Sequence, residues 1–289
     1  MKGDVFLVMT NKHGYLLMVP IILGLLVVQG CGKTNFFRQI GLASGNGASS
    51  VSNLESILDS AGPGNPAKYT EVISAADAII NSSSSTTADR QKAYAYKGEA
   101  LLGKNGITVT EIVSNLNNVG TNPLDAFNLS SASANEIAAA AVALNAASSQ
   151  GDLSSDQQMT RAIANAAAIS TKVNEVFSVT NNAVSVKGGA SAESALSQLV
   201  GGGSGSDDGL TDFASALADS VADLSGLDDE QKGTVTDISD KAEDATDLNG
   251  AVASRDTSYQ VGNTAYDFSN ESTRSSNITN ALSSIFFGN

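Results

Sequence analysis

The thiol of Cys31 and the imidazole of His13 are the only side chains of their kinds in this 289-residue sequence. Thiols and imidazoles serve enzymes as nucleophiles, general bases and zinc ligands, so their positions limit the chemistry open to the chain. Both flank an uncharged apolar run over residues 15–28, which Lys2 and Lys12 precede. A run of this length is short for a helix that spans a bilayer and is typical of the hydrophobic region of a signal peptide.

The residues Val28-Gln29-Gly30-Cys31 resemble the lipobox of bacterial lipoproteins, although Gln29 is less usual at its position. The resemblance implies cleavage after Gly30, a thioether-linked diacylglycerol on Cys31 and an N-acyl chain. Two or more acyl chains hold a protein stably at a membrane, whereas one does not. Gly32, in place of Asp, favours the outer membrane of diderm bacteria. The alternative is an uncleaved N-terminal anchor that has a cysteine there by chance.

Removal of residues 1–30 would take away His13, two lysines and one aspartate, leaving 14 basic and 29 acidic side chains and a net charge of −15. With Cys31 acylated, the mature chain would have neither an imidazole nor a free thiol. This excludes histidine-based catalysis, cysteine nucleophiles and zinc sites built from His or Cys. We therefore expect no enzyme, no cofactor and no metal. The pI of about 4.3 also disfavours binding of nucleic acid.

The composition divides the chain into four parts. Residues 1–30 are the expected signal peptide, and residues 31–50, rich in Gly, Ser and Asn, are expected to form a flexible tether. Residues 51–122 have helical periodicity with turn signals between the helices. Residues 123–289 are rich in Ala and Ser, later in acidic residues, and are also expected to be helical. The sequence thus predicts an all-α fold with almost no strand.

Residues 51–122 contain an internal similarity. We expect three helices here. The first begins at Asn65-Pro66, the second spans residues 88–102, and the third begins at Thr108. Thr70-Glu71-Val72-Ile73-Ser74 recurs as Thr110-Glu111-Ile112-Val113-Ser114, an offset of forty residues. A repeat of this period predicts stacked helix pairs, because one pair cannot bury its own apolar face.

The segment Ala93-Tyr94-x-x-Lys97-Gly98-x-Ala100-Leu101-x-x-Gly103 resembles the first helix of a tetratricopeptide repeat, with Lys97 and Leu101 departing from its usual residues. The resemblance covers residues 65–120 and implies a helix-pair array, an α-solenoid-like bundle with an extended concave face. Tyr94, Tyr96 and Lys97 would then line a groove of the helix pair. Two alternatives stay open: the aromatic side chains fill the core, or the two similar helices are unrelated.

The later part of the chain predicts further helices. Ser133 and Glu136 form a possible capping pair for a helix that runs to Ala147. Ser155 and Gln158 form another for the longest helix, which runs to about Val179. Residues 201–206 are expected to be a flexible linker. Apolar stripes then predict helices over residues 210–224 and 235–245, a polar tail from residue 251, and a last helix over residues 278–286.

Residues 207–247 hold thirteen acidic side chains against Lys232 and Lys241. They are interpreted as a solvated acidic helix face, with calcium or a basic partner face as alternatives. A calcium loop is disfavoured, because Ala245 stands where the first Asp ligand belongs. Asp228-Asp229-Glu230 is expected at a helix N-terminus, where acid complements the helix dipole.

Together these patterns predict a non-catalytic envelope lipoprotein, anchored to the membrane through Cys31 and facing the periplasm or the cell surface. Its helical-repeat surface would serve as a scaffold for another envelope protein. A small-ligand-binding or surface structural lipoprotein is the alternative function.

Overall fold

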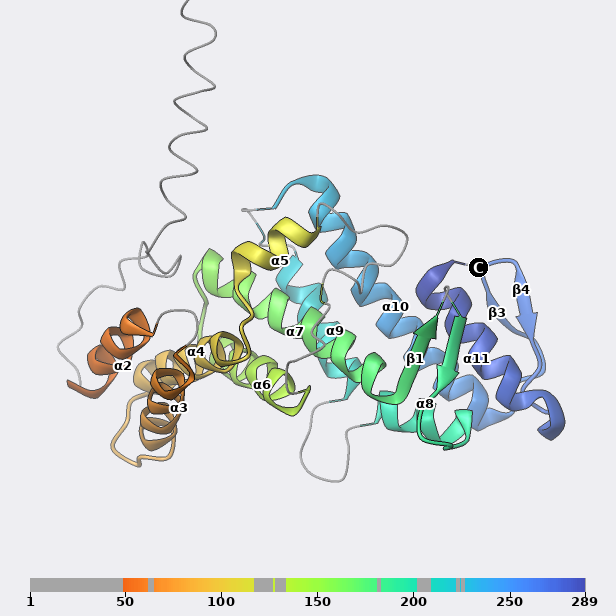
Figure 1. Cartoon of the computed structure of the whole chain (residues 1–289), viewed down its shortest axis with the longest axis horizontal. Helices are drawn as coiled ribbons and strands as arrows, with labels where there is room; N and C mark the ends of the chain where they lie inside the picture. The colour runs from red at the N-terminus through yellow and green to blue at the C-terminus, as the bar shows by residue number, and fades with distance from the viewer. Residues whose placement is uncertain are drawn as a thin grey trace, which may run out of the picture. The chain divides into compact units, whose positions relative to one another are not determined.

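The computed structural model describes residues 49–61, 65–116, 127, 134–180, 183–201, 209–221, 224 and 227–288 (Figure 1). The expected signal peptide, nearly all of the expected tether, the division between residues 122 and 123, and most of the 201–206 linker lie outside these residues. The unit described below falls within Gly45–Asn289.

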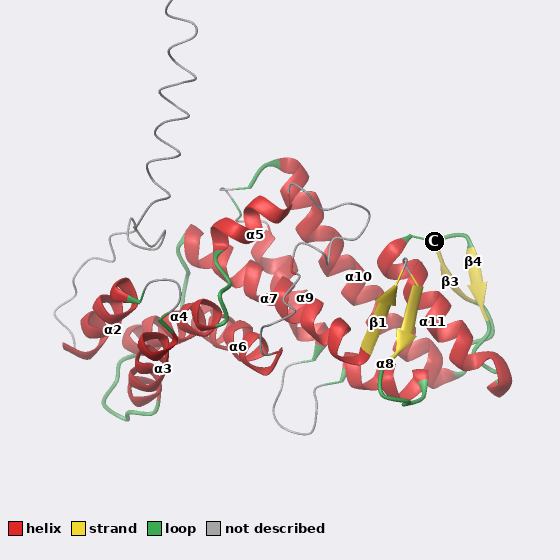
Figure 2. Cartoon of the chain, in the orientation of Figure 1, coloured by secondary structure: helices red, strands yellow, loops and turns green. Residues whose placement is uncertain are grey.

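The described residues form ten helices and two short β-hairpins, so the predicted all-α class is confirmed (Figure 2). The helices are α2 (Ser49–Ser60), α3 (Pro66–Ile80), α4 (Thr87–Lys104), α5 (Val109–Leu116), α6 (Ala134–Gln150), α7 (Ser155–Val176), α8 (Ala192–Val200), α9 (Leu210–Val221), α10 (Asp229–Ser254) and α11 (Glu271–Phe287). The antiparallel hairpins are β1 (Phe177–Thr180) with β2 (Ala183–Val186), and β3 (Tyr259–Val261) with β4 (Thr264–Tyr266).

Side chains that cap backbone N–H groups fix several helix starts. The Asn65 side chain accepts from the Lys68 N–H, with Pro66 in the first helical position, as predicted. Asp228 begins α10 in a reciprocal capping box with Gln231, which confirms acid at that N-terminus. The predicted cap of α7 is wrong by one residue, because Ser154 rather than Ser155 has the extended backbone that a cap requires.

The strands are the main departure from the predicted elements. Helix α7 ends at Val176 rather than Val179, and the chain continues into β1, whose Phe177 pairs with Val186. The second hairpin turns at Gly262, which has a positive φ of 57°. Its Tyr259 and Tyr266 rings lie 6.0 and 6.4 Å from the ring of Phe268, so the expected polar tail supplies a small aromatic cluster.

Seven helices pack one on another in the order of the chain: α2 on α3, α3 on α4, α4 on α6, α6 on α7, α7 on α9 and α9 on α10. Helices α5 and α8 lie outside this series. Helix α5 packs mainly on α7 and α10, and α8 packs mainly on α10, α11 and α7. Val113 of α5 accepts a hydrogen bond from the Gln231 side chain of α10. The forty-residue similarity therefore lacks equivalent packing. The helix-pair arrangement implied by the tetratricopeptide resemblance is not confirmed.

Buried apolar side chains form two clusters. The main core contains side chains from α4 through α11, with many alanines on α6 and α7. The smaller cluster lies between α2, α3 and α4 and includes Leu54, Tyr69 and Tyr96. Helix α4 therefore contributes one face to each cluster.

Gly98 allows α4 to approach α6 closely. A Cβ atom built on Gly98 would lie 2.5 Å from Leu144 Cγ and 3.0 Å from the Ala140 carbonyl oxygen. Both distances are too short for ordinary contact, and Leu144 and Ala140 are fully buried. The α4–α6 spacing therefore requires a residue without a side chain at this position.

Gly98→Ala is expected to lower the free energy of unfolding by about 1–3 kcal/mol, because overpacking outweighs the higher helix propensity of alanine. The matched control is Gly233→Ala in α10, where a Cβ atom has no neighbour within 4 Å. It should be neutral or stabilising by about 0.5–1 kcal/mol. Urea unfolding followed by circular dichroism measures both changes. Equal effects of the two substitutions would contradict the close α4–α6 packing.

Candidate functional site

The predicted lipidation residue Cys31 and cleavage residue Gly30 lie outside the described residues. Within the described part of the chain, no helix is both long and apolar enough to cross a bilayer. The candidate groups that the structure does place are those on α4, α8 and α10.

The three side chains expected to line a groove have different environments. Tyr96 is 6% exposed and fills the smaller cluster, as the alternative interpretation expected for an aromatic side chain. Lys97 Nζ donates to Asp77 Oδ1 of α3 at 2.7 Å, an ion pair that joins α3 to α4. Tyr94 is partly exposed. The structure thus gives Tyr96 a packing role and Lys97 a role in holding two helices together.

Glu99, one helical turn after Tyr96, is a buried carboxyl group that sequence reasoning missed. It is only 6% exposed, and its Oε2 atom has no hydrogen-bond partner. Its acidic neighbours are Glu55 and Asp59, two exposed residues four positions apart on α2. A buried carboxylate without a partner is strongly disfavoured, so Glu99 is the main electrostatic anomaly of this region.

Burial is the main cause of an altered pKa at Glu99. Loss of hydration, followed by repulsion from Glu55 and Asp59, raises the pKa of this carboxyl to about 8. Burial, with the same acidic neighbours and Glu99 itself, also raises the pKa of Tyr96. Glu99 is therefore mainly protonated near neutral pH, and it titrates where a normal glutamate is already fully ionised.

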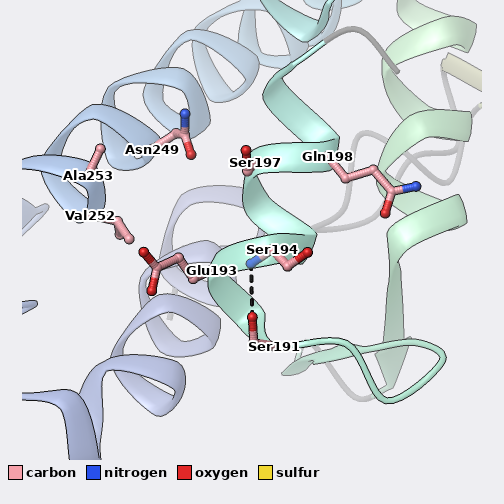
Figure 3. A pocket seen from close by; sticks show the side chains of 8 residues that line it. All are labelled: Ser191, Glu193, Ser194, Ser197, Gln198, Asn249, Val252 and Ala253. Carbon is pink, nitrogen blue, oxygen red and sulfur yellow. Dashed lines mark hydrogen bonds between the residues drawn. The ribbon is translucent and has the colours of Figure 1, made fainter. Parts of the chain in front are cut away.

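A polar groove lies between α8 and α10 (Figure 3). It has a volume of about 650 Å³, and Glu193 and Asn249 enter it from the two helices. The Glu193 carboxylate is paired with Arg255 at 2.8 Å and Arg274 at 3.7 Å, so its charge is already balanced. The remaining polar groups are hydroxyls, including that of Ser197, and side-chain amides. This chemistry suits a neutral, hydrogen-bonding molecule.

The acidic residues of α10 lie on its solvent-exposed face. These exposed residues are Asp229, Glu230, Asp237, Asp240, Glu243, Asp244 and Asp247. The described residues contain no group of three or more His, Cys, Asp or Glu side chains arranged to hold a metal ion. Ala245, at the position of the missing calcium ligand, is fully buried. The arrangement fits a solvated helix face.

No family model, curated protein or solved structure matches this chain. The assignment of a site therefore rests on the residues and their geometry. Of these groups, Glu99 departs furthest from the normal environment of its residue type. The sequence gives only a partial indication that Glu99 is buried. Glu99 stands between Gly98 and Ala100 in a helix rich in small residues, which indicates close packing on more than one face.

Glu99→Gln is expected to stabilise the protein at pH 8 and to flatten the dependence of stability on pH. The folded-state pKa of about 8 exceeds the ordinary value of 4.5, so the folded state binds the proton more tightly. The stabilisation that the bound proton gives the folded state is complete below pH 4.5. It is lost as the pH rises to about 8, by up to about 1.4 kcal/mol per pH unit.

Urea unfolding between pH 4.5 and 8.5 measures this dependence. The control is Glu71→Gln on α3, an exposed glutamate paired with Lys68, which should leave the wild-type slope unchanged. A wild-type slope that persists in Glu99→Gln would show that Glu99 is not the buried titrating group.

Proposed function

We propose that the chain is a bacterial lipoprotein that acts as a non-catalytic scaffold for another protein of the cell envelope. The position of Cys31 carries this proposal. It is the only cysteine in the sequence, and it directly follows an apolar run and Gly30, where the lipobox resemblance requires a cysteine. Acyl chains on this thiol would attach the helical body to a membrane surface, with the outer membrane favoured by Gly32.

The described body supports attachment through a terminal lipid. Its large apolar side chains pack in the two internal clusters, and none of its described helices could span a bilayer. Its exposed acidic residues on α10 would be repelled by anionic lipid headgroups. A body of this kind needs a separate device to stay at a membrane, and acylated Cys31 would provide it.

A scaffolding role is supported by the packing of seven helices in series, from α2 through α3, α4, α6, α7 and α9 to α10, in which each helix has residues exposed to solvent. Long helical surfaces of this kind suit protein partners. The mature chain would lack imidazole and thiol groups, which removes the commonest catalytic side chains. Protein binding therefore fits the available chemistry better than catalysis.

Cys31→Ala is expected to abolish incorporation of a radiolabelled fatty acid and to leave the precursor uncleaved, because the acceptor thiol is lost. Labelling of growing cells, followed by gel electrophoresis of the immunoprecipitated protein, measures both effects. Gly32→Ala is the control, since it retains the thiol and should be labelled and processed like the wild type. Equal labelling of the Cys31→Ala and wild-type proteins would contradict lipidation at this residue.

A scaffold should contact its partner through one defined face. Photo-crosslinking residues placed at the exposed positions Glu71, Asp240 and Thr273 sample α3, α10 and α11 in intact cells. We expect a discrete adduct with the same envelope protein from one or two of these positions, and none from the remainder. Absence of any adduct from all three, or indiscriminate adducts from each, would contradict a specific scaffold.

Small-ligand binding is the second candidate function, and the groove between α8 and α10 favours it. A neutral saccharide is a suitable probe because the groove presents hydroxyl and amide groups and a balanced charge. A panel of mono- and disaccharides should raise the melting temperature of the wild type but not of Asn249→Leu, if the groove binds such molecules. No shift with any saccharide would count against this candidate.

A further inference from the structure

Helix α2 is attached to the body through contacts separate from the main core. Its buried residues Val51, Leu54 and Leu58, with Ala61 directly after the helix, belong to the smaller cluster, which also contains side chains of α3 and α4. The Tyr69 hydroxyl of α3 donates to the Ala61 carbonyl oxygen at 3.0 Å at the end of this helix. Loss of these contacts would release α2 while leaving the main core in place.

Three acidic side chains of α2 and α4 interact electrostatically across this attachment. Glu99 of α4 is buried with an unpartnered Oε2, and Glu55 and Asp59 of α2 lie close enough to repel it. Tyr96 is the other titratable group that interacts with this set. The lysines of α3 and α4 that form ion pairs are engaged elsewhere, in the pairs Lys68–Glu71, Lys97–Asp77 and Lys104–Glu136.

We propose that the protonation state of Glu99 controls whether α2 stays docked on α3 and α4. A neutral carboxyl tolerates burial, whereas a carboxylate there is dehydrated, unpaired and repelled by two further carboxylates. Lifting α2 away gives the ionised group access to water and relieves the repulsion. The proton leaves the Glu99 carboxyl for solvent as the helix is released, so docking weakens as the pH rises.

Release of α2 would change the connection between the body and its proposed anchor. The helix has 12 residues, and as an extended chain they would span about 40 Å. Only this consequence rests on the proposed lipidation at Cys31, since the docking equilibrium itself belongs to the body. Undocking would also expose apolar side chains of α3 and α4 that α2 now covers, including Tyr69 and Tyr96.

Amide hydrogen exchange of the full chain between pH 6 and 9 tests the proposal. The exchange rate of the α2 amides in the wild type is compared, at each pH, with the rate in Glu99→Gln, which cancels the intrinsic effect of pH. We expect the ratio of the two rates to rise roughly 100-fold across this range and to level off above about pH 8. Amides of α7 in the main core should show no such rise.

Two further variants make the result specific. Glu71→Gln should behave like the wild type. The double substitution of Glu55→Gln with Asp59→Asn alters only exposed side chains. Because it removes the repulsion on Glu99, the ratio of exchange rates should level off at a lower pH than in the wild type. A pH-independent ratio, or loss of protection in α2 and α7 together, would overturn the proposal, and either result leaves the test of lipidation at Cys31 unaffected.

Discussion

The close approach of α4, α6 and α7 is the constraint on which the body depends. Gly98 admits Leu144 and the Ala140 carbonyl at distances that no side chain would allow. Most buried residues of α6 are alanine, and α7 buries five more alanines; alanine packs without loss of rotamer entropy. Short side chains bury less apolar area per residue than leucine, so the stability of this core depends on how closely the backbones approach.

Polar side chains in this tightly packed region are accommodated by pairing. Asn145 and Asn165 exchange two hydrogen bonds of 3.0 Å between α6 and α7, and Arg161 Nε donates to Asn145 Oδ1 at 2.8 Å. Glu99 of α4, by contrast, has no such partner at Oε2. Glu99 is therefore the buried polar group of this region whose protonation can change, and the proposed release of α2 follows from its packing.

The sequence predicts some features of this fold well because they depend on neighbouring residues alone. Asn65-Pro66 and Asp228 begin helices through contacts within one turn. The packing of α5 was beyond such reasoning, because its similarity to α3 does not specify its tertiary neighbours α7 and α10. The β3–β4 hairpin had a signal in Gly262-Asn263, a two-residue turn between short strands. The small residues on either side of Glu99 indicate close packing, but its burial depends on the other helices that pack on α4, and neighbouring residues alone do not specify them.

The account of function depends on a covalent lipid at Cys31, which would hold a body with an internal core beside a membrane. Mass spectrometry of the N-terminal peptide of the membrane-extracted protein measures this modification directly. The account predicts a peptide that begins at Cys31 and carries the added mass of a diacylglycerol and an N-acyl chain. A peptide that contains Cys31 with an unmodified thiol and still extends into residues 1–30 would contradict it.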